Sequence, residues 1–266
     1  MKERLDVVLA EKGFFPSREK AKAAIMAGVV YVDGNRADKP GTPVNSGAEF
    51  SIKEDICPYV SRGGMKLEKA VKEFGIDLEG SICMDIGAST GGFTDCMLQN
   101  GASAVYTVDV GYGQLDWKLR NDSRVINMEK TNIRLLNPDS VEARFDFISI
   151  DVSFISLKLV FPVAAGLLKA TGQLVCLVKP QFEAGRGQVG KKGVVKDKEI
   201  HKEVILNVIE YGNSNGIYAH GLVYSPVTGA KGNIEYLILF KKTEDNTAGI
   251  SDDTINLIIN NSHLEL

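Results

Sequence analysis

Short apolar runs alternate with longer segments of helical spacing over most of the chain after residue 60. The runs predict strands at 82–86, 104–109, 125–128, 145–151 and 174–179. Helical spacing is clearest over 154–168 and 196–211. This alternation is typical of βαβ units, so it predicts a parallel sheet covered by helices on both faces. The last two runs, 217–225 and 234–241, have no helix between them and predict an antiparallel pair that closes the sheet.

The first fifty residues have a different pattern. Apolar spacing over 4–12 indicates a helix, and Ser17 stands where the N-cap of a second helix over 18–26 is expected. A strand then runs into Asp33-Gly34, a turn signal of the hairpin kind, and a further strand is predicted over 48–52. These elements make a compact α-α-β-β unit.

The pattern divides the chain into four parts. We expect a small domain over 1–53, a linker over 54–62 and a large domain over 63–242, which a helix from about residue 64 to 74 opens. Residues 243–266 are polar and weakly patterned, and they predict a loose tail with at most a short helix near 255–259.

Composition narrows the class of protein. The 266 residues are 44% hydrophobic and 24% charged, which is ordinary for a globular protein. The net charge of −3 means that any contact with nucleic acid must come from local clusters of basic residues. The four cysteines and three histidines lack metal-binding spacing, so no metal is expected. No stretch approaches the ~18–20 apolar residues of a membrane span, and no signal core is present, which predicts a cytoplasmic protein without membrane contact.

A glycine-rich turn, D-I-G-A-S-T-G-G-F-T-D, begins at Asp85 and follows the apolar run 82–84. Glycines here let the backbone approach a nucleotide-like ligand, and the next helix presents its first amides to the same space. The spacing differs from the G-x-G-x-x-G of dinucleotide sites, and Asp85 would repel a phosphate. S-adenosylmethionine has two cationic groups and no phosphate, so it fits better. The alternative is a turn that only packs a helix against the sheet.

Charged residues at strand ends are the candidates for chemistry, because ligands of open parallel sheets bind there. Asp109 is placed to accept hydrogen bonds from a ribose, while Asp151 and Lys179 each end an apolar run, and Glu235 lies near the start of the antiparallel last strand. Lys66, from the preceding helix, completes the group.

Two lysines and two acids suit methylation of a ribose hydroxyl. A lysine can take the hydroxyl proton only when neutral, and a second lysine nearby lowers the amine pKa. We therefore predict Lys179 as the base, Lys66 as its electrostatic partner, and Asp151 and Glu235 as orienting groups. Structural alternatives remain for each: Lys179 can extend to solvent, and Asp151 can cap the next helix. Glu235 can pair with an exposed cross-strand lysine, and Lys66 can belong to a solvated helix face, with Lys69 as its rival.

The motifs resemble two known families. The pattern R-L-D…S-R…G-V-V-Y-V-D-G over residues 3–52 is similar to the RNA-binding domain first seen in ribosomal protein S-four. S-R-x-x-x-K-L, D-I-G-x-x-x-G-G-F, L-V-K-P-Q-F-E and N-I-E-Y together resemble the FtsJ-like ribose 2′-O-methyltransferases. The whole chain to about residue 241 looks like the TlyA-type proteins, once called hemolysins, which methylate cytidine ribose in ribosomal RNA.

The resemblance implies a fold and a set of roles. The fold is a Rossmann-like S-adenosylmethionine-dependent methyltransferase, a seven-stranded, mostly parallel sheet with helices on both faces, after a small α+β RNA-binding domain. The catalytic tetrad falls on Lys66, Asp151, Lys179 and Glu235. Cofactor contacts fall on Asp85, Gly87, Ala88, Ser89, Gly91, Gly92, Phe93, Asp109 and Asn132. Asn132 departs from the family, which usually has an acid there for the adenine.

Basic residues give the candidate RNA contacts. They are Arg4, Arg18, Lys20, Lys22, Arg62, Arg186, Lys191 and Lys192. The last three belong to a glycine-rich loop directly after Lys179, which either closes over the RNA backbone or is an ordinary solvated loop. The basic helix 18–26 has the same solvated alternative.

The expected function is S-adenosylmethionine-dependent methylation of ribose 2′-hydroxyls, of cytidine as the resemblance implies, in ribosomal RNA or ribosomal subunits. One alternative is a non-catalytic RNA-binding protein of ribosome assembly that keeps the cofactor pocket only as structure. Membrane lysis, suggested by the family's old name, lacks a strongly apolar or basic amphipathic segment in this sequence.

Overall fold

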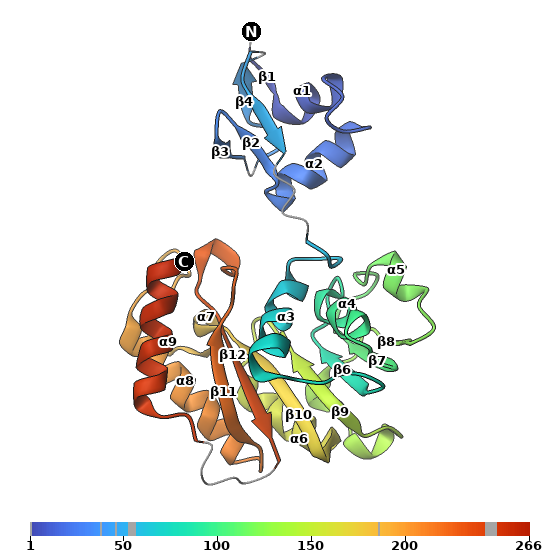
Figure 1. Cartoon of the computed structure of the whole chain (residues 1–266), viewed down its shortest axis with the longest axis vertical. Helices are drawn as coiled ribbons and strands as arrows, with labels where there is room; N and C mark the ends of the chain where they lie inside the picture. The colour runs from blue at the N-terminus through green and yellow to red at the C-terminus, as the bar shows by residue number, and fades with distance from the viewer. Residues whose placement is uncertain (1, 38, 46, 53–56, 186, 243–248) are drawn as a thin grey trace. The chain divides into compact units, whose positions relative to one another are not determined.

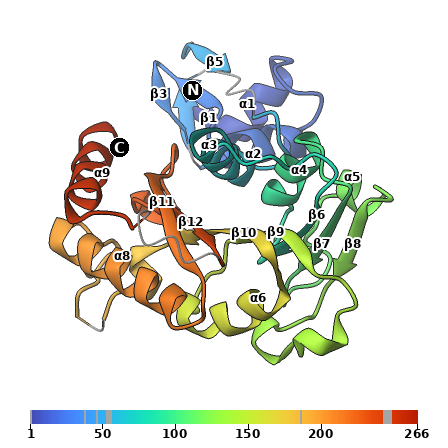
Figure 2. The same ribbon diagram turned by 60° about the horizontal axis from the view of Figure 1, so that its bottom comes forward.

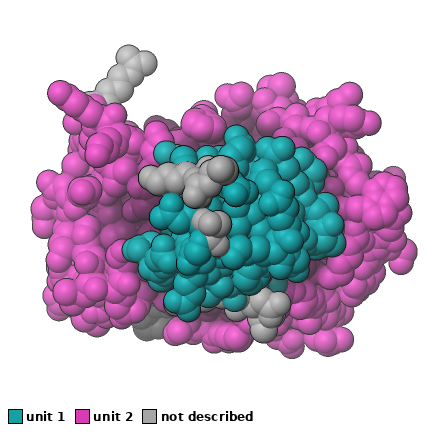
Figure 3. All heavy atoms as spheres, turned by 90° about the horizontal axis from the view of Figure 1, so that it is seen from above, with its two compact units in different colours: residues 1–57 teal, residues 58–266 magenta. Residues whose placement is uncertain are grey.

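The structure is a computed structural model that describes residues 2–37, 39–45, 47–52, 57–185, 187–242 and 249–266. The chain divides after Cys57 into two compact units, which Figure 3 colours separately. Unit 1 is Met1–Cys57 and unit 2 is Pro58–Leu266. The division falls within the stretch 54–62 where the linker is expected.

Unit 1 packs two helices against short antiparallel strands. Its elements are β1 (Lys2–Arg4), α1 (Leu5–Glu11), α2 (Arg18–Ala27), β2 (Val30–Val32), β3 (Asn35–Arg36), β4 (Pro43–Asn45) and β5 (Phe50–Ile52). Ser17 caps α2 by accepting a hydrogen bond from the Lys20 amide, and Gly28 ends the helix with φ of 75°. The sequence missed β1, β3 and β4, because each of these segments contains at most one apolar residue and so shows no apolar run.

Unit 2 is built on a seven-stranded sheet with the order β11-β12-β10-β9-β6-β7-β8 (Figure 1). The strands are β6 (Ile82–Ile86), β7 (Ala104–Val108), β8 (Val125–Met128), β9 (Phe145–Ile150), β10 (Leu168–Val178), β11 (Tyr218–Tyr224) and β12 (Tyr236–Lys241). The first five pair in parallel, whereas β12 pairs antiparallel with both β10 and β11. The predicted mostly parallel sheet with its antiparallel closing pair is confirmed.

Helices cover both faces of this sheet. Figure 2 shows α3 (Gly63–Phe74) and α4 (Gly92–Gln99) on one side, and α6 (Phe161–Leu167) and α8 (Lys198–Asn213) on the other. Shorter helical pieces are α5 (Trp117–Arg120), α7 (Pro180–Glu183), η1 (Ile133–Leu135), η2 (Pro138–Ser140), η3 (Leu157–Leu159) and η4 (Ala230–Gly232). Because the carboxyl ends of the parallel strands share one edge of the sheet, the polar residues that follow them are brought together.

Two expectations from the sequence were wrong. The helix predicted over 154–168 begins only at Phe161, since Phe154 adopts a φ of 64° and Pro162 stands in the first turn, where proline suits a helix start. Strand β10 begins at Leu168, the last residue of that predicted helix and six residues before the predicted strand start at 174.

The expected loose tail is the second correction. Within the described part of the tail, α9 (Asp252–Glu265) is a 14-residue helix that packs on α8 and β11. Ser251 caps it by accepting a hydrogen bond from the Thr254 amide, and Ile255 and Ile259 are buried. The helix was missed because its one apolar stripe is narrow and its other face is polar. Residues 243–248 lie outside the described part of the chain.

Candidate active site

The glycine-rich turn brings the ends of β6 and β9 together. Gly87 has a φ of 85°, and a Cβ atom at this position would lie 2.5 Å from the carbonyl oxygen of Asp151. A side chain here would both strain the backbone and displace Asp151. Gly87 therefore fixes the distance between the turn and the residue that follows β9.

A second close approach places helix α3 against the start of α4. A Cβ atom on Gly92 would lie 2.3 Å from Ser61 Oγ and 2.8 Å from the Gly64 amide nitrogen. The backbones of the two helices can meet only because this residue is glycine. The contact orients α3 so that Lys66 faces the carboxyl ends of the strands.

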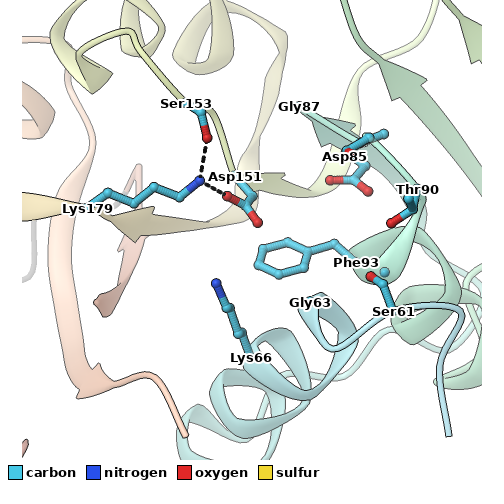
Figure 4. A pocket seen from close by; sticks show the side chains of 13 residues that line it. Ser61, Gly63, Lys66, Asp85, Gly87, Thr90, Phe93, Asp151, Ser153 and Lys179 are labelled. Carbon is cyan, nitrogen blue, oxygen red and sulfur yellow. Dashed lines mark hydrogen bonds and ion pairs between the residues drawn. The ribbon is translucent and has the colours of Figure 1, made fainter. Parts of the chain in front are cut away.

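These elements enclose a cavity of about 270 Å³, here called the lysine cavity (Figure 4). Its lining residues are Ser61, Gly63, Lys66, Asp85, Gly87, Ala88, Ser89, Thr90, Gly92, Phe93, Asp151, Ser153 and Lys179. The amines of Lys66 and Lys179 both point toward the region of Asp151 in Figure 4, one from α3 and the other from the end of β10. The structure thus brings both lysines to one site.

The four predicted catalytic residues form two ion pairs. Lys179 Nζ lies 2.5 Å from Asp151 Oδ1 and donates to Ser153 Oγ at 3.0 Å. Lys66 Nζ donates to Glu235 Oε2 at 2.6 Å. The side chains of Lys66 and Glu235 are 12% and 2% exposed, so this pair is almost dry. Lys179 therefore does not extend into solvent, and the Asp151 side chain contacts Lys179 rather than capping a helix.

Packing also separates Lys66 from its rival Lys69. The Lys69 amine lies over the ring of Tyr224, 3.6 Å from its centroid, and not at the lysine cavity. Burial lowers the pKa of Lys69, while Glu73 and Glu265 raise it. Of these two lysines, only Lys66 contacts Glu235.

Glu235 is also held from the side opposite Lys66. Gln181 Nε2 donates to Glu235 Oε1 at 3.3 Å, and a Cβ atom on Gly229 would lie 2.0 Å from the same oxygen. The carboxylate is therefore enclosed by backbone and by one amide, which leaves its other oxygen directed at Lys66.

Asp85 is fully buried at the wall of the lysine cavity. Its oxygens accept hydrogen bonds from two neutral hydroxyls, Thr94 Oγ1 at 2.7 Å and Ser149 Oγ at 3.0 Å. Burial raises the pKa of the Asp85 carboxyl to about 6, although both hydroxyls oppose the shift. A cationic group bound beside this carboxylate would stabilise its ionised form.

A second cavity of about 480 Å³, here called the Asp109 cavity, shares Gly87, Ser89, Asp151 and Ser153 with the first. Apolar side chains line it, including Val108, Ile133 and Ile155. Asp109 lies in its wall and accepts hydrogen bonds from the amides of Ser89 and Gly111, at 2.8 and 2.7 Å. Asn132 lies in the same wall and accepts from the Arg134 amide at 3.1 Å. The two cavities form neighbouring parts of one cleft.

One predicted cofactor residue faces elsewhere. A Cβ atom on Gly91 would lie 2.2 Å from Leu119 Cδ1 and 2.7 Å from Leu115 Cδ1. With a φ of 94°, Gly91 instead makes the left-handed turn that begins α4. Its part in the site is to shape the turn, because its Cα packs against leucines rather than the cleft.

The sequence missed two residues beside Lys179. Ser153 accepts the hydrogen bond from its amine, and Phe154 is 90% exposed although it is a large aromatic residue. The ring of Phe154 lies 4.8 Å from that of Phe182, centroid to centroid. The positions of Ser153 and Phe154, shortly after Asp151, could have indicated them as site residues, because residues just beyond a strand end lie at the same edge of the sheet as the tetrad.

The basic residues predicted to bind RNA in unit 1 are partly occupied within that unit. Arg4 Nε and Arg18 Nε lie 3.0 and 2.8 Å from the two oxygens of buried Asp6, and these contacts hold the pKa of Asp6 well below its usual range. The arginine side chains nevertheless remain 52% and 48% exposed. Lys22 pairs with Glu19, and Lys20 is exposed.

The remaining predicted RNA contacts belong to unit 2. Arg62, Lys191 and Lys192 are exposed, and Arg186 lies outside the described residues.

Across the described ranges, no group of three or more His, Cys, Asp and Glu side chains could hold a metal ion. In the same ranges, no helix combines the length and the apolar character that crossing a bilayer requires.

Comparison with known proteins decides the family. Residues 59–242 match the FtsJ-like methyltransferase family, and residues 3–50 match the S4 domain. This chain belongs to the FtsJ-like methyltransferases. The expected family, fold and enzyme class are therefore confirmed.

Individual relatives cover nearly the whole of this FtsJ-like methyltransferase. It is 49% identical over 268 residues to the "Putative rRNA methyltransferase YqxC" of Bacillus subtilis, across 100% of this chain and 95% of the relative. It is 42% identical to the 16S/23S rRNA (cytidine-2′-O)-methyltransferase TlyA of Mycobacterium tuberculosis, across 91% of each chain. A solved structure of a "putative hemolysin" from Streptococcus thermophilus has a TM-score of 0.78 and 48% identity, and covers 99% of this chain and 96% of its own.

Proposed function

We propose that this chain transfers a methyl group from S-adenosylmethionine to a ribose 2′-hydroxyl of ribosomal RNA. The observation that carries the proposal is the convergence of two lysine–carboxylate pairs, Lys179 with Asp151 and Lys66 with Glu235, beside a glycine-rich cleft. The names of the relatives supply the substrate class, ribosomal RNA, and the cytidine nucleotide.

The cleft has the chemistry that S-adenosylmethionine requires. The Asp109 cavity offers apolar side chains to the adenine and the Asp109 carboxylate to the ribose hydroxyls. Asp85, at the wall of the lysine cavity, suits the ammonium group. The bound cofactor would supply a methyl group carried on a sulfonium and leave as the neutral thioether.

The residues of the lysine cavity have different roles in the proposed methyl transfer. Lys179, once it has released to solvent the proton that pairs it with Asp151, would take the proton of the 2′-hydroxyl, so that the ribose oxygen could accept the methyl group. Asp151 and Ser153 orient the Lys179 amine, since both contact it directly. Lys66, held by Glu235, lines the same cavity and positions the ribose. Alignment of the reacting atoms supplies much of the rate of such a displacement.

Two further features fit an RNA substrate. Phe154, 90% exposed and beside Phe182, offers an aromatic surface on which the base of the target nucleotide can stack. Unit 1, with its S4 domain, and the exposed residues Lys20, Arg62 and Lys191 would hold the surrounding RNA backbone.

The test is methylation of ribosomal subunits by the purified protein with radiolabelled S-adenosylmethionine, followed by mapping of 2′-O-methyl groups. We expect incorporation at cytidine ribose, with a steep loss of rate as salt rises. Binding of ribosomal RNA without incorporation into any RNA, together with no calorimetric binding of S-adenosylmethionine, would instead support the non-catalytic assembly protein.

Replacing Asp85 with asparagine should separate cofactor binding from stability. Losing the charge should weaken S-adenosylmethionine binding by about 10-fold or more, because a hydrogen bond to a charged group is worth about 1.5–3 kcal/mol. The raised pKa of Asp85, about 6, means that its ionisation opposes folding above that pH.

Asp85→Asn should therefore melt at the same or a higher temperature than the unmodified protein at pH 7.5. The difference should shrink as the pH falls to 5, where Asp85 is increasingly protonated in the folded state. Calorimetric titration and thermal melting at both pH values measure these effects. An asparagine variant that binds the cofactor normally would remove the proposed ammonium contact.

A further inference from the structure

Side-chain contacts link helix α9 to both partners of the Lys66–Glu235 ion pair, directly to β12 and by way of β11 to α3. It lies beside α8 in Figure 1 and Figure 2, and its last turn holds Ser262, His263 and Glu265. These residues take part in two separate sets of polar contacts. One set reaches β12 next to Glu235, and the other reaches α3 one turn after Lys66.

The first set surrounds Tyr236, the residue that follows Glu235. The Tyr236 side chain is fully buried, and its hydroxyl lies 2.7 Å from His201 Nδ1 and 3.1 Å from Ser262 Oγ. His201 Nε2 lies 3.1 Å from the Val195 carbonyl oxygen, which can only accept. The proton of a neutral His201 is therefore on Nε2, and the Tyr236 hydroxyl donates to Nδ1.

Burial keeps His201 in that neutral state. It lowers the pKa of His201 to about 4, while the hydrogen bond to the Val195 carbonyl and the charge of Asp197 oppose the shift and His263 adds to it. His263 Nε2 also lies 3.3 Å from His201 Nδ1. At neutral pH the acceptor for the Tyr236 hydroxyl is thus permanent, and it ties β12 to α8 and α9.

The second set surrounds Tyr224, at the end of β11. The Tyr224 hydroxyl donates to Glu265 Oε2 at 2.6 Å. The ring of the same tyrosine carries the Lys69 amine, 3.6 Å from its centroid. Because Lys69 comes three residues after Lys66 on α3, this contact fixes the rotation of the helix that presents Lys66.

We propose that α9 is a positioning element for the Lys66–Glu235 pair, acting on Glu235 through Tyr236 and on Lys66 through Tyr224 and Lys69. The part assigned to this pair in methyl transfer rests on the proposed function. The claim that α9 keeps Lys66 and Glu235 in contact concerns geometry alone and is independent of the proposed function.

The contacts explain why both sets are needed. Glu235 precedes β12 and points to α3, whereas Tyr236 is the first residue of the strand and points to α8. A shift of β12 along its axis would move both residues together. The pair also depends on α3, which packs on β11 and β12 but is not hydrogen-bonded to them as a strand would be. Anchors on both elements hold the 2.6 Å contact between the two charged groups.

The test uses Tyr236→Phe and Tyr224→Phe, which each remove one hydroxyl and keep the ring. Tyr218→Phe is the matched control, because Tyr218 lies at the other end of β11, opposite Lys241. The first readout does not need activity: labelling of lysines by an amine-reactive reagent, followed residue by residue by mass spectrometry. Labelling of Lys66 should rise several-fold in both variants, while Lys179 and the control protein should keep their rates.

The second readout is kinetic. Misplacing Lys66 should lower kcat by about 10-fold in each variant and leave the cofactor Kd unchanged, because the Asp109 cavity is formed by other elements. A purely structural role for α9 would lower the melting temperature and leave kcat per folded molecule at the level of the control.

Unchanged labelling of Lys66 in both variants would overturn the inference. An unmodified protein that methylates nothing would instead remove the proposed function, and the labelling result would still decide the role of α9. Should either phenylalanine variant fail to fold, Ser262→Ala and Glu265→Ala remove the same two contacts from the side of α9.

Discussion

Replacing Lys179 with alanine is expected to lower kcat for methyl transfer by about 100-fold or more, the usual contribution of a general base. The amine is removed from the centre of the tetrad, where it contacts both Asp151 and Ser153. The cofactor Kd should remain within a factor of about two, because the Asp109 cavity is lined by other residues. Single-turnover methylation of ribosomal RNA and calorimetric titration measure the two quantities.

The control is Lys192→Ala, which removes an exposed lysine from the loop after α7. It should weaken RNA binding slightly and leave the single-turnover rate at saturating RNA unchanged, because an exposed contact to the RNA backbone contributes affinity rather than chemistry. Full methylation by Lys179→Ala would mean that another group takes the proton.

Replacing Lys66 with methionine is expected to have the second largest effect, on stability as well as on activity. The substitution leaves Glu235, 2% exposed, as a buried carboxylate without its ion-pair partner. Removing one partner of a buried pair costs about 3 kcal/mol or more, which for a unit of this size lowers the melting temperature by about 6–12 °C. Calorimetric melting of the full chain measures the shift.

The double variant Lys66→Met, Glu235→Gln separates the two effects. Without the buried charge, most of the lost stability should return, because the glutamine is neutral and can still accept from Gln181. The rate of methyl transfer should stay low, since the lysine is still missing. A double variant as unstable as the single one would show that the lysine stabilises unit 2 by packing rather than by its charge.

The sequence by itself determined most of the architecture, and it supplied the four residues that we propose as the tetrad. Every strand of the large sheet was predicted within a few residues at its active-site end, because buried strands are mostly apolar runs, and a charged residue directly follows the last apolar residues of β9 and β10. That rule also identified Asp151 and Lys179. The turn that starts at Asp85 was recognisable because its glycines and its acid lie close together in the chain.

Only the tertiary structure decided which polar residues meet. Lys66 and Lys69 lie three residues apart on one helix, and local sequence does not separate their roles. The packing of α3 against Gly92 and β11 places Lys66 against Glu235 and Lys69 against Tyr224. Side-chain contacts between residues far apart in the chain leave no periodic signal along it.

The same reason accounts for Asp6 and for α9. Asp6 was read as part of a helix, and its hold on Arg18 requires the two helices of unit 1 to pack together. The polar tail predicted at most a short helix near 255–259, because its few apolar residues are stabilising only when α8 and β11 supply the surface that buries them. Local pattern fixes the elements of this protein, and long-range packing chooses the partners of its charged side chains.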